Sequence, residues 1–238
     1  MPQSKSSSDF FLKFSVTVSI FGIIFMPMLL LQSDKYQIDF PFTRILIGLL
    51  YAGICLLGIS AVFYPKKCEK TFMFGKHGKL GVYGDHADLS KKIRFRGHHP
   101  DCEKFSANRI EIRKTVLCSS CAGLLVGAMS TFVGNLFYYF VGFVLIPADP
   151  RILLVSNAGM LIGLIQFKFG NYLKLIVNAL FVLSSFLTLI TVDLLSKNLL
   201  IDLYVLGLIV FLLLTRIALS EWNNKRICAK CEACELHE

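Results

Sequence analysis

Four residues with metal-binding side chains lie close together near the middle of the chain. Two residues separate His99 from Cys102, two separate Cys118 from Cys121, and fifteen lie between the two pairs. Imidazole and thiolate groups at this spacing form tetrahedral structural zinc sites. The pattern therefore predicts that these four residues bind one zinc ion. The alternative is that the two pairs are unrelated and bind nothing.

His98 could take the place of His99 in this site. We favour His99 because its two-residue gap to Cys102 reproduces a C-P-x-C knuckle with His in the first position; His98 would then support the ligands from outside. Four protein ligands leave no open position for water, which argues against zinc hydrolysis. The sequence contains no H-E-x-x-H, G-x-S-x-G or P-loop pattern. We therefore expect a role other than that of an enzyme.

A second set of ligands occupies the C-terminal tail. Cys228, Cys231, Cys234 and His237 follow one another at every third position. On a straight helix they would spread around about half of the cylinder and could not meet one ion. The tail must therefore turn, or share ligands with Cys68. Three interpretations stay open: a second zinc site completed by Cys68 or His237, an iron–sulfur site, and a solvated tail without metal.

The composition indicates a membrane protein. Hydrophobic residues make up 55% of the chain, 21 of the 238 residues are Phe, and the mean hydropathy is +0.62. Six apolar runs have about the length of a membrane span: 14–31, 44–63, 121–146, 152–167, 173–195 and 199–219. The first resembles a signal peptide but lacks a small-x-small cleavage site. The run 152–167 is short and contains Ser156 and Asn157, so a re-entrant or interfacial segment is its alternative.

The positive charges predict the orientation. Six spans place 21 of the 25 Lys and Arg on one side of the membrane, and only Lys35, Arg44, Arg151 and Lys197 on the other. Positive loops stay in the cytoplasm, so we expect a multi-pass protein of the cell membrane with both termini cytoplasmic. Seven of the eight Cys would share that side, where thiols stay reduced and bind metal more often than they form disulfides.

The hydropathy divides the chain into four parts: 1–64 with the first two spans, a polar insert at 65–120, 121–219 with four spans, and the tail 220–238. The insert is too small and polar to bury a large core, so a metal ion is expected to stabilise it. Residues 109–112 and 115–117 flank Arg113-Lys114 and predict a hairpin that leads into Cys118. Further hairpins are expected near 70–86. The fold class is an all-α six-helix transmembrane bundle with a cytoplasmic zinc-ribbon-like insert between the second and third helices.

The motif H-H-P-x-C at 98–102, followed by C-x-x-C-x-G-L-x-x-G at 118–127, resembles a motif of small prokaryotic, chiefly archaeal, multi-span membrane proteins of unknown function. The resemblance covers about thirty residues, and the rest of the chain is similar only in hydropathy. It implies the zinc-ribbon-like site and leaves the activity open, since the family has no established one.

The insert is also basic, with thirteen Lys and Arg against six Asp and Glu between Tyr64 and Cys118. Its expected partners are the lipid bilayer, anionic lipid head groups and an unidentified cytoplasmic protein. Nucleic acid is not favoured because no RNA-binding motif with interleaved aromatic residues accompanies the charge.

Polar residues within the spans are few. Asn135, Asn157 and Asn178 are typical of hydrogen bonds between helices, and the pairs Gly123/Gly127 and Gly159/Gly163 predict close helix contacts. Asp193 and Asp202 fall at span ends. We therefore favour a membrane scaffold that docks a partner. The alternatives are a small-solute transporter or channel with a cavity lined by the three Asn, and a membrane redox protein that uses the tail cysteines.

Overall fold

The computed structural model describes residues 4–31, 42–63, 95–96, 99–100, 108–112, 115–144 and 147–228. The hairpins expected near 70–86 lie outside these residues. The helices are α1 (Ser4–Leu31), α2 (Thr43–Phe63), α4 (Ser119–Asn135), its π-helical continuation η3 (Leu136–Val141), α5 (Pro150–Leu164), the short 3-10 helix η4 (Gln166–Lys168), α6 (Asn171–Ser196) and α7 (Leu199–Cys228). The strands are β1 (Phe95–Arg96), β2 (His99–Pro100), β3 (Arg109–Ile112) and β4 (Thr115–Cys118).

Within the described residues, five helical stretches are long and apolar enough to cross a membrane: Asp9–Leu31, Thr43–Phe63, Ser119–Val141, Asn171–Ser196 and Leu199–Asn224. Their outward faces carry exposed large side chains such as Phe21, Leu57 and Val126. Soluble proteins rarely expose so wide an apolar surface to water. The chain is therefore a multi-pass membrane protein. The predicted fourth span is present as α5, but its 15 residues are fewer than a full crossing needs.

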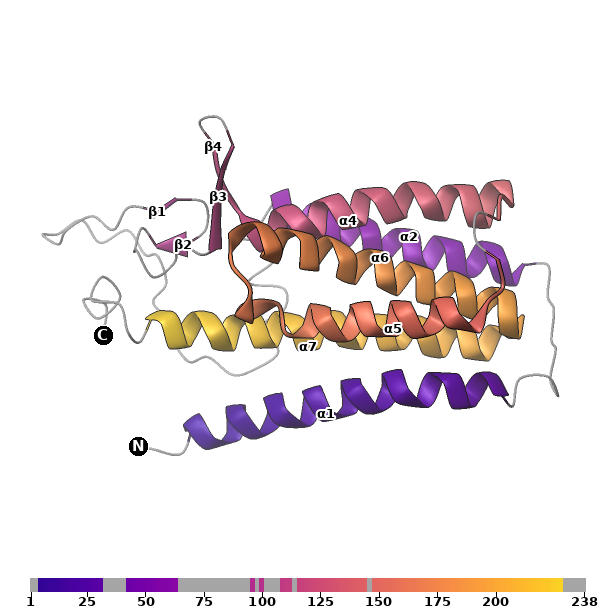
Figure 1. Cartoon of the computed structure of the whole chain (residues 1–238), viewed down its shortest axis with the longest axis horizontal. Coiled ribbons are helices and arrows are strands. Elements are labelled where there is room, and N and C mark those ends of the chain that lie inside the picture. The colour runs from indigo at the N-terminus through magenta and orange to yellow at the C-terminus, as the bar shows by residue number, and fades with distance from the viewer. Residues whose placement is uncertain are drawn as a thin grey trace, which may run out of the picture.

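The helices lie along one bundle axis and successive helices alternate in direction, so that α4 and α6 run parallel to each other (Figure 1). α6 is the central helix, since 67% of its most apolar window is buried, against 22–39% in the other four. It packs against α4, α5 and α7, while α2 packs on α4 and α1 on α7. The start of α1 and the end of α7 lie at the same end of the bundle as the four strands (Figure 1).

Glycines bring α4 and α5 close to α6. A side chain at Gly123 would overlap the carbonyl oxygen of Leu175, and one at Gly127 would lie 2.8 Å from Cβ of Val182. On α5, side chains at Gly159 and Gly163 would overlap Ser184 and Phe181 of α6. The prediction of close helix contacts at both glycine pairs is confirmed. Small residues permit this approach because the backbones themselves form the interface.

Hydrogen bonds from polar side chains also join helices. Nδ2 of Asn135 donates to the carbonyl oxygen of Gly48, at 3.0 Å, and so ties α4 to α2. The hydroxyl of Thr188 on α6 donates to that of Ser156 on α5, at 2.8 Å. The interhelical interpretation is confirmed for Asn135. The side chain of Asn178 bonds instead to the Lys174 carbonyl within α6.

Two small antiparallel sheets stand at the end of the bundle. β1 pairs with β2, with Arg96 opposite His99, and β3 pairs with β4, with Arg109 opposite Cys118. The hairpin predicted at 109–118 is thus confirmed. β4 ends at Cys118 and α4 begins at Ser119, so strand and helix follow each other without a linker.

Candidate metal centre at the start of α4

Cys118 and Cys121 are brought together by the junction of β4 and α4. Cys118 is the N-cap residue of α4, with extended backbone angles (φ −70°, ψ 124°), and no side chain caps the helix there. Cys118 is 8% exposed, and Cys121, in the first turn, is half-buried. Unpaired N–H groups and the helix dipole favour negative charge at this position. The start of α4 is therefore a suitable place for anionic ligands of a metal ion.

Two buried cations lie at the same end of the bundle. Nζ of Lys174 on α6 donates a 2.5 Å hydrogen bond to Oδ1 of Asn108, the residue before β3. Nη2 of Arg216 on α7 donates a 2.8 Å hydrogen bond to Oε1 of Gln166, and the guanidinium lies 4.5 Å from the ring centroid of Phe181. Lys174 is 6% exposed and Arg216 is 3% exposed, so neither charge is solvated by bulk water.

The cations and the thiols lie within electrostatic range of each other. A charge on Cys118 acts on Lys174, and a charge on Cys121 acts on Arg216. In the described part of the chain, neither cation forms an ion pair with a carboxylate, and Nε and Nη1 of Arg216 have no hydrogen-bond partner. Buried charges are normally compensated by an opposite charge. Anionic sulfur at Cys118 and Cys121 is the compensating charge that these residues offer.

The structure places only part of the predicted ligand set. His99 lies in β2 and Cys228 is the last residue of α7, but the side chains of both are outside the described residues. The same holds for the whole of Cys68, His98, Cys102, Cys231, Cys234 and His237. Among the side chains that are described, no three His, Cys, Asp or Glu come together as a metal site. The zinc prediction therefore stays a prediction, and a pair of thiols beside compensating cations suits a thiolate-bound metal.

Lys174 and Arg216 were not predicted as parts of this site, because the count of positive charges treats them only as signals of membrane orientation. Arg216 could have been found, since an ionisable residue inside an apolar run usually faces the protein interior and has a partner. Lys174 carried a weaker signal, being the fourth residue of α6.

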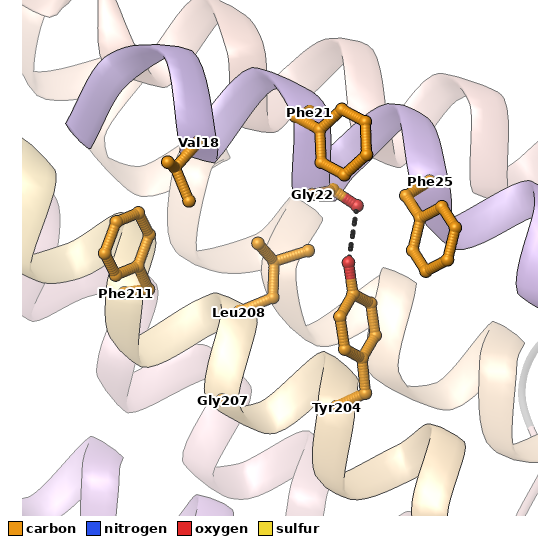
Figure 2. A pocket seen from close by; sticks show the side chains of 8 residues that line it. All are labelled: Val18, Phe21, Gly22, Phe25, Tyr204, Gly207, Leu208 and Phe211. Atoms are coloured by element: carbon orange, nitrogen blue, oxygen red, sulfur yellow. Dashed lines mark hydrogen bonds between the residues drawn. The ribbon is translucent and has the colours of Figure 1, made fainter. Parts of the chain in front are cut away.

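A groove between α1 and α7 has a different character (Figure 2). It has a volume of about 460 Å³, and its lining includes Phe21, Phe25, Leu208 and Phe211. The hydroxyl of Tyr204 does not face the groove as a free group, because it donates to the Gly22 carbonyl at 3.1 Å. None of the three Asn that a polar transport cavity would use lines this groove. Its chemistry suits an acyl chain of the surrounding lipid.

Comparisons with protein-family models, with curated proteins and with solved structures found no match. The resemblance of the 98–127 motif to small prokaryotic membrane proteins therefore also stays a prediction.

Proposed function

We propose that this membrane protein holds a structural zinc ion at the cytoplasmic end of its helix bundle, with Cys118, Cys121, His99 and Cys102 as ligands. The zinc-bound insert serves as a non-enzymatic scaffold that docks a cytoplasmic protein. The observation that carries this proposal is the placement of two thiols at the start of α4 beside two buried cations.

The charges favour a metal thiolate centre. Three thiolates and one neutral imidazole around Zn²⁺ carry one net negative charge. That charge would offset part of the positive charge of Lys174 and Arg216, which interact with Cys118 and Cys121. A disulfide between the two cysteines would be neutral and would leave both cations uncompensated. This favours metal-bound thiolates over a disulfide at Cys118 and Cys121, and leaves open the redox alternative, which uses the tail cysteines.

The scaffold role follows from how the insert is attached. β3 is tied to α6 through Asn108 and Lys174, and β4 continues directly into α4. A zinc ion on Cys118 and Cys121 would therefore fix the insert at one angle to the bundle. Its thirteen Lys and Arg would face anionic lipid head groups and the docked protein.

We also propose a second metal site in the tail. Cys228 ends α7 at the same end of the bundle as Cys118 (Figure 1). Cys231 and Cys234 follow it, and Cys68 or His237 would complete the site, with zinc or an iron–sulfur cluster as its metal.

Metal analysis of the full-length protein, purified in detergent without chelator, tests the first site. We expect Cys118→Ser to lose about one zinc per chain relative to the wild type, since one lost ligand breaks a site whose binding energy folds the insert. Cys55→Ser is the matched control, because Cys55 is a buried thiol on α2 whose sulfur lies 3.6 Å from the Thr131 hydroxyl. Equal zinc in Cys118→Ser and Cys55→Ser would refute the proposal.

A further inference from the structure

Two carboxyl groups meet at the end of the bundle opposite the strands. Asp193 lies near the end of α6 and Asp202 in the first turn of α7, and they are 7% and 0% exposed. The turn between the helices is fixed by bonds from the Lys197 N–H to the Asp193 carbonyl, at 3.2 Å, and from the Asp202 N–H to the Asn198 carbonyl, at 3.1 Å. The turn packs the start of α7 against the end of α6, where the two buried carboxyl groups are close enough to interact electrostatically.

The two carboxyl groups have very different surroundings. Oδ2 of Asp193 accepts a 2.5 Å hydrogen bond from the Tyr138 hydroxyl and lies 3.7 Å from Nε of Arg44. No N–H or O–H group of the described residues donates to either oxygen of Asp202. Hydrogen bonds and a nearby cation stabilise the anionic form of a carboxyl group, while burial without them stabilises the neutral form. Asp202 is therefore the carboxyl group of the pair whose oxygens lack donated hydrogen bonds in the described part of the chain.

The Tyr139 hydroxyl is a further buried polar group at this end of the bundle. Tyr139 is 5% exposed, and its hydroxyl has no hydrogen-bond partner among the described residues. It lies close enough to Asp193 and Asp202 to interact with both charges. The Tyr139 hydroxyl and both Asp202 oxygens are thus buried polar atoms at this end of the bundle that lack a hydrogen-bond partner among the described residues.

The charge count gives the same result. Two ionised carboxyl groups and Arg44 would leave one net negative charge in a buried site. The other charged groups described at this end do not offset it: Lys197 is exposed, and Arg151 is 89% exposed and paired with Asp149 at 3.2 Å. Two carboxylates in contact do not both stay ionised. One added positive charge neutralises the site, and a proton needs no additional space.

We propose that Asp193 and Asp202 bind one proton between them, with Asp202 carrying it and donating a hydrogen bond to Asp193. The bound proton holds the first turn of α7 against the end of α6 and against η3. Its release places two negative charges side by side and loosens these contacts. The protein then has a proton-binding site at the membrane face opposite the insert, independent of any metal site.

Infrared spectroscopy of the full-length protein in lipid bilayers tests this proposal. We expect a carbonyl stretching band of a buried protonated carboxyl group at neutral pH. Asp202→Asn should abolish the band, whereas Asp149→Asn, which removes a partly exposed carboxylate at the same end, should leave it unchanged. If Asp202→Asn does not fold, Tyr138→Phe provides the assignment, because loss of its hydrogen bond to Asp193 should shift the band.

Thermal unfolding supplies a second readout. An exposed Asp in the unfolded chain has a pKa of about 4 and is ionised at neutral pH. The folded protein then holds one proton more than the unfolded chain, so the free energy of unfolding should fall as the pH rises. Asp202→Asn should weaken this dependence. A wild-type spectrum without the band would overturn the proposal. The proposal would also be overturned if the wild type were more stable in sodium salt than in choline salt and Asp202→Asn showed no such difference. The site would then bind a metal cation and not a proton.

Discussion

The side-chain oxygen of Gln166 accepts a 2.8 Å hydrogen bond from Nη2 of Arg216, so the segment between α5 and α6 is held by a charge on α7. The same guanidinium covers the ring of Phe181 on α6. One arginine thus joins three helical segments at the end of the bundle that carries the two cysteines.

Arg216→Met distinguishes a compensated charge from an uncompensated one. If anionic sulfur balances Arg216, the substitution should lower stability by about 2–4 kcal/mol, because it leaves that anion without its counter-charge in addition to the unpaired Gln166 and the lost contact with Phe181. Removal of a buried charge without a counter-charge would instead be neutral or stabilising. Thermal unfolding in detergent measures the sign. Arg226→Met is the control, because Arg226 is exposed and its guanidinium lies over the Trp222 ring, 4.2 Å from the centroid.

Gly123→Ala should destabilise the bundle. The added methyl group would overlap the Leu175 carbonyl, and forcing α4 away from α6 costs about 1–3 kcal/mol. Gly53→Ala should be neutral or stabilising, because nothing lies within 4 Å of its Cβ position and Ala favours a helix interior by about 0.5–1 kcal/mol. Unfolding midpoints of the two variants check the difference; equal midpoints would contradict the close contact.

A reporter inserted near Lys91 or fused after Glu238 should be cytoplasmic, and one inserted after Lys35 should be external. The expectation follows from the 21 Lys and Arg on one side. Reporter activity or accessibility to a membrane-impermeant label measures it. External labelling near Lys91 would reverse the orientation and remove the reason to expect reduced thiols.

Replacement of Cys228, Cys231 and Cys234 by Ser should remove one of two bound metals and leave the first site filled. The last turn of α7 should remain, since Cys228 is the end of that helix. Metal content per chain measures the loss. A wild-type protein with a single metal, unchanged by the triple substitution, would show that the tail cysteines bind none.

The helices and the hairpin 109–118 could be predicted because each depends on a local pattern. Apolar runs give the spans, and the alternation at 109–117 gives the strands. The burial of Lys174 and Arg216 inside the protein could not be predicted from charge counts, because these counts assign a residue only to one side of the membrane. Pairing could not be predicted either: Asn178 satisfies its own helix, while Asn135 reaches across to Gly48, and the two have the same residue type and a similar apolar context.

The glycine contacts of α4 and α5 also determine the order in which the bundle can assemble. Both surfaces fit α6, which is synthesised after both helices. While the ribosome has not yet passed residue 196, Gly123, Gly127, Gly159 and Gly163 have no matching partner in the nascent chain. α4 and α5 therefore cannot form these contacts until α6 has been synthesised, and the centre of the bundle forms only then.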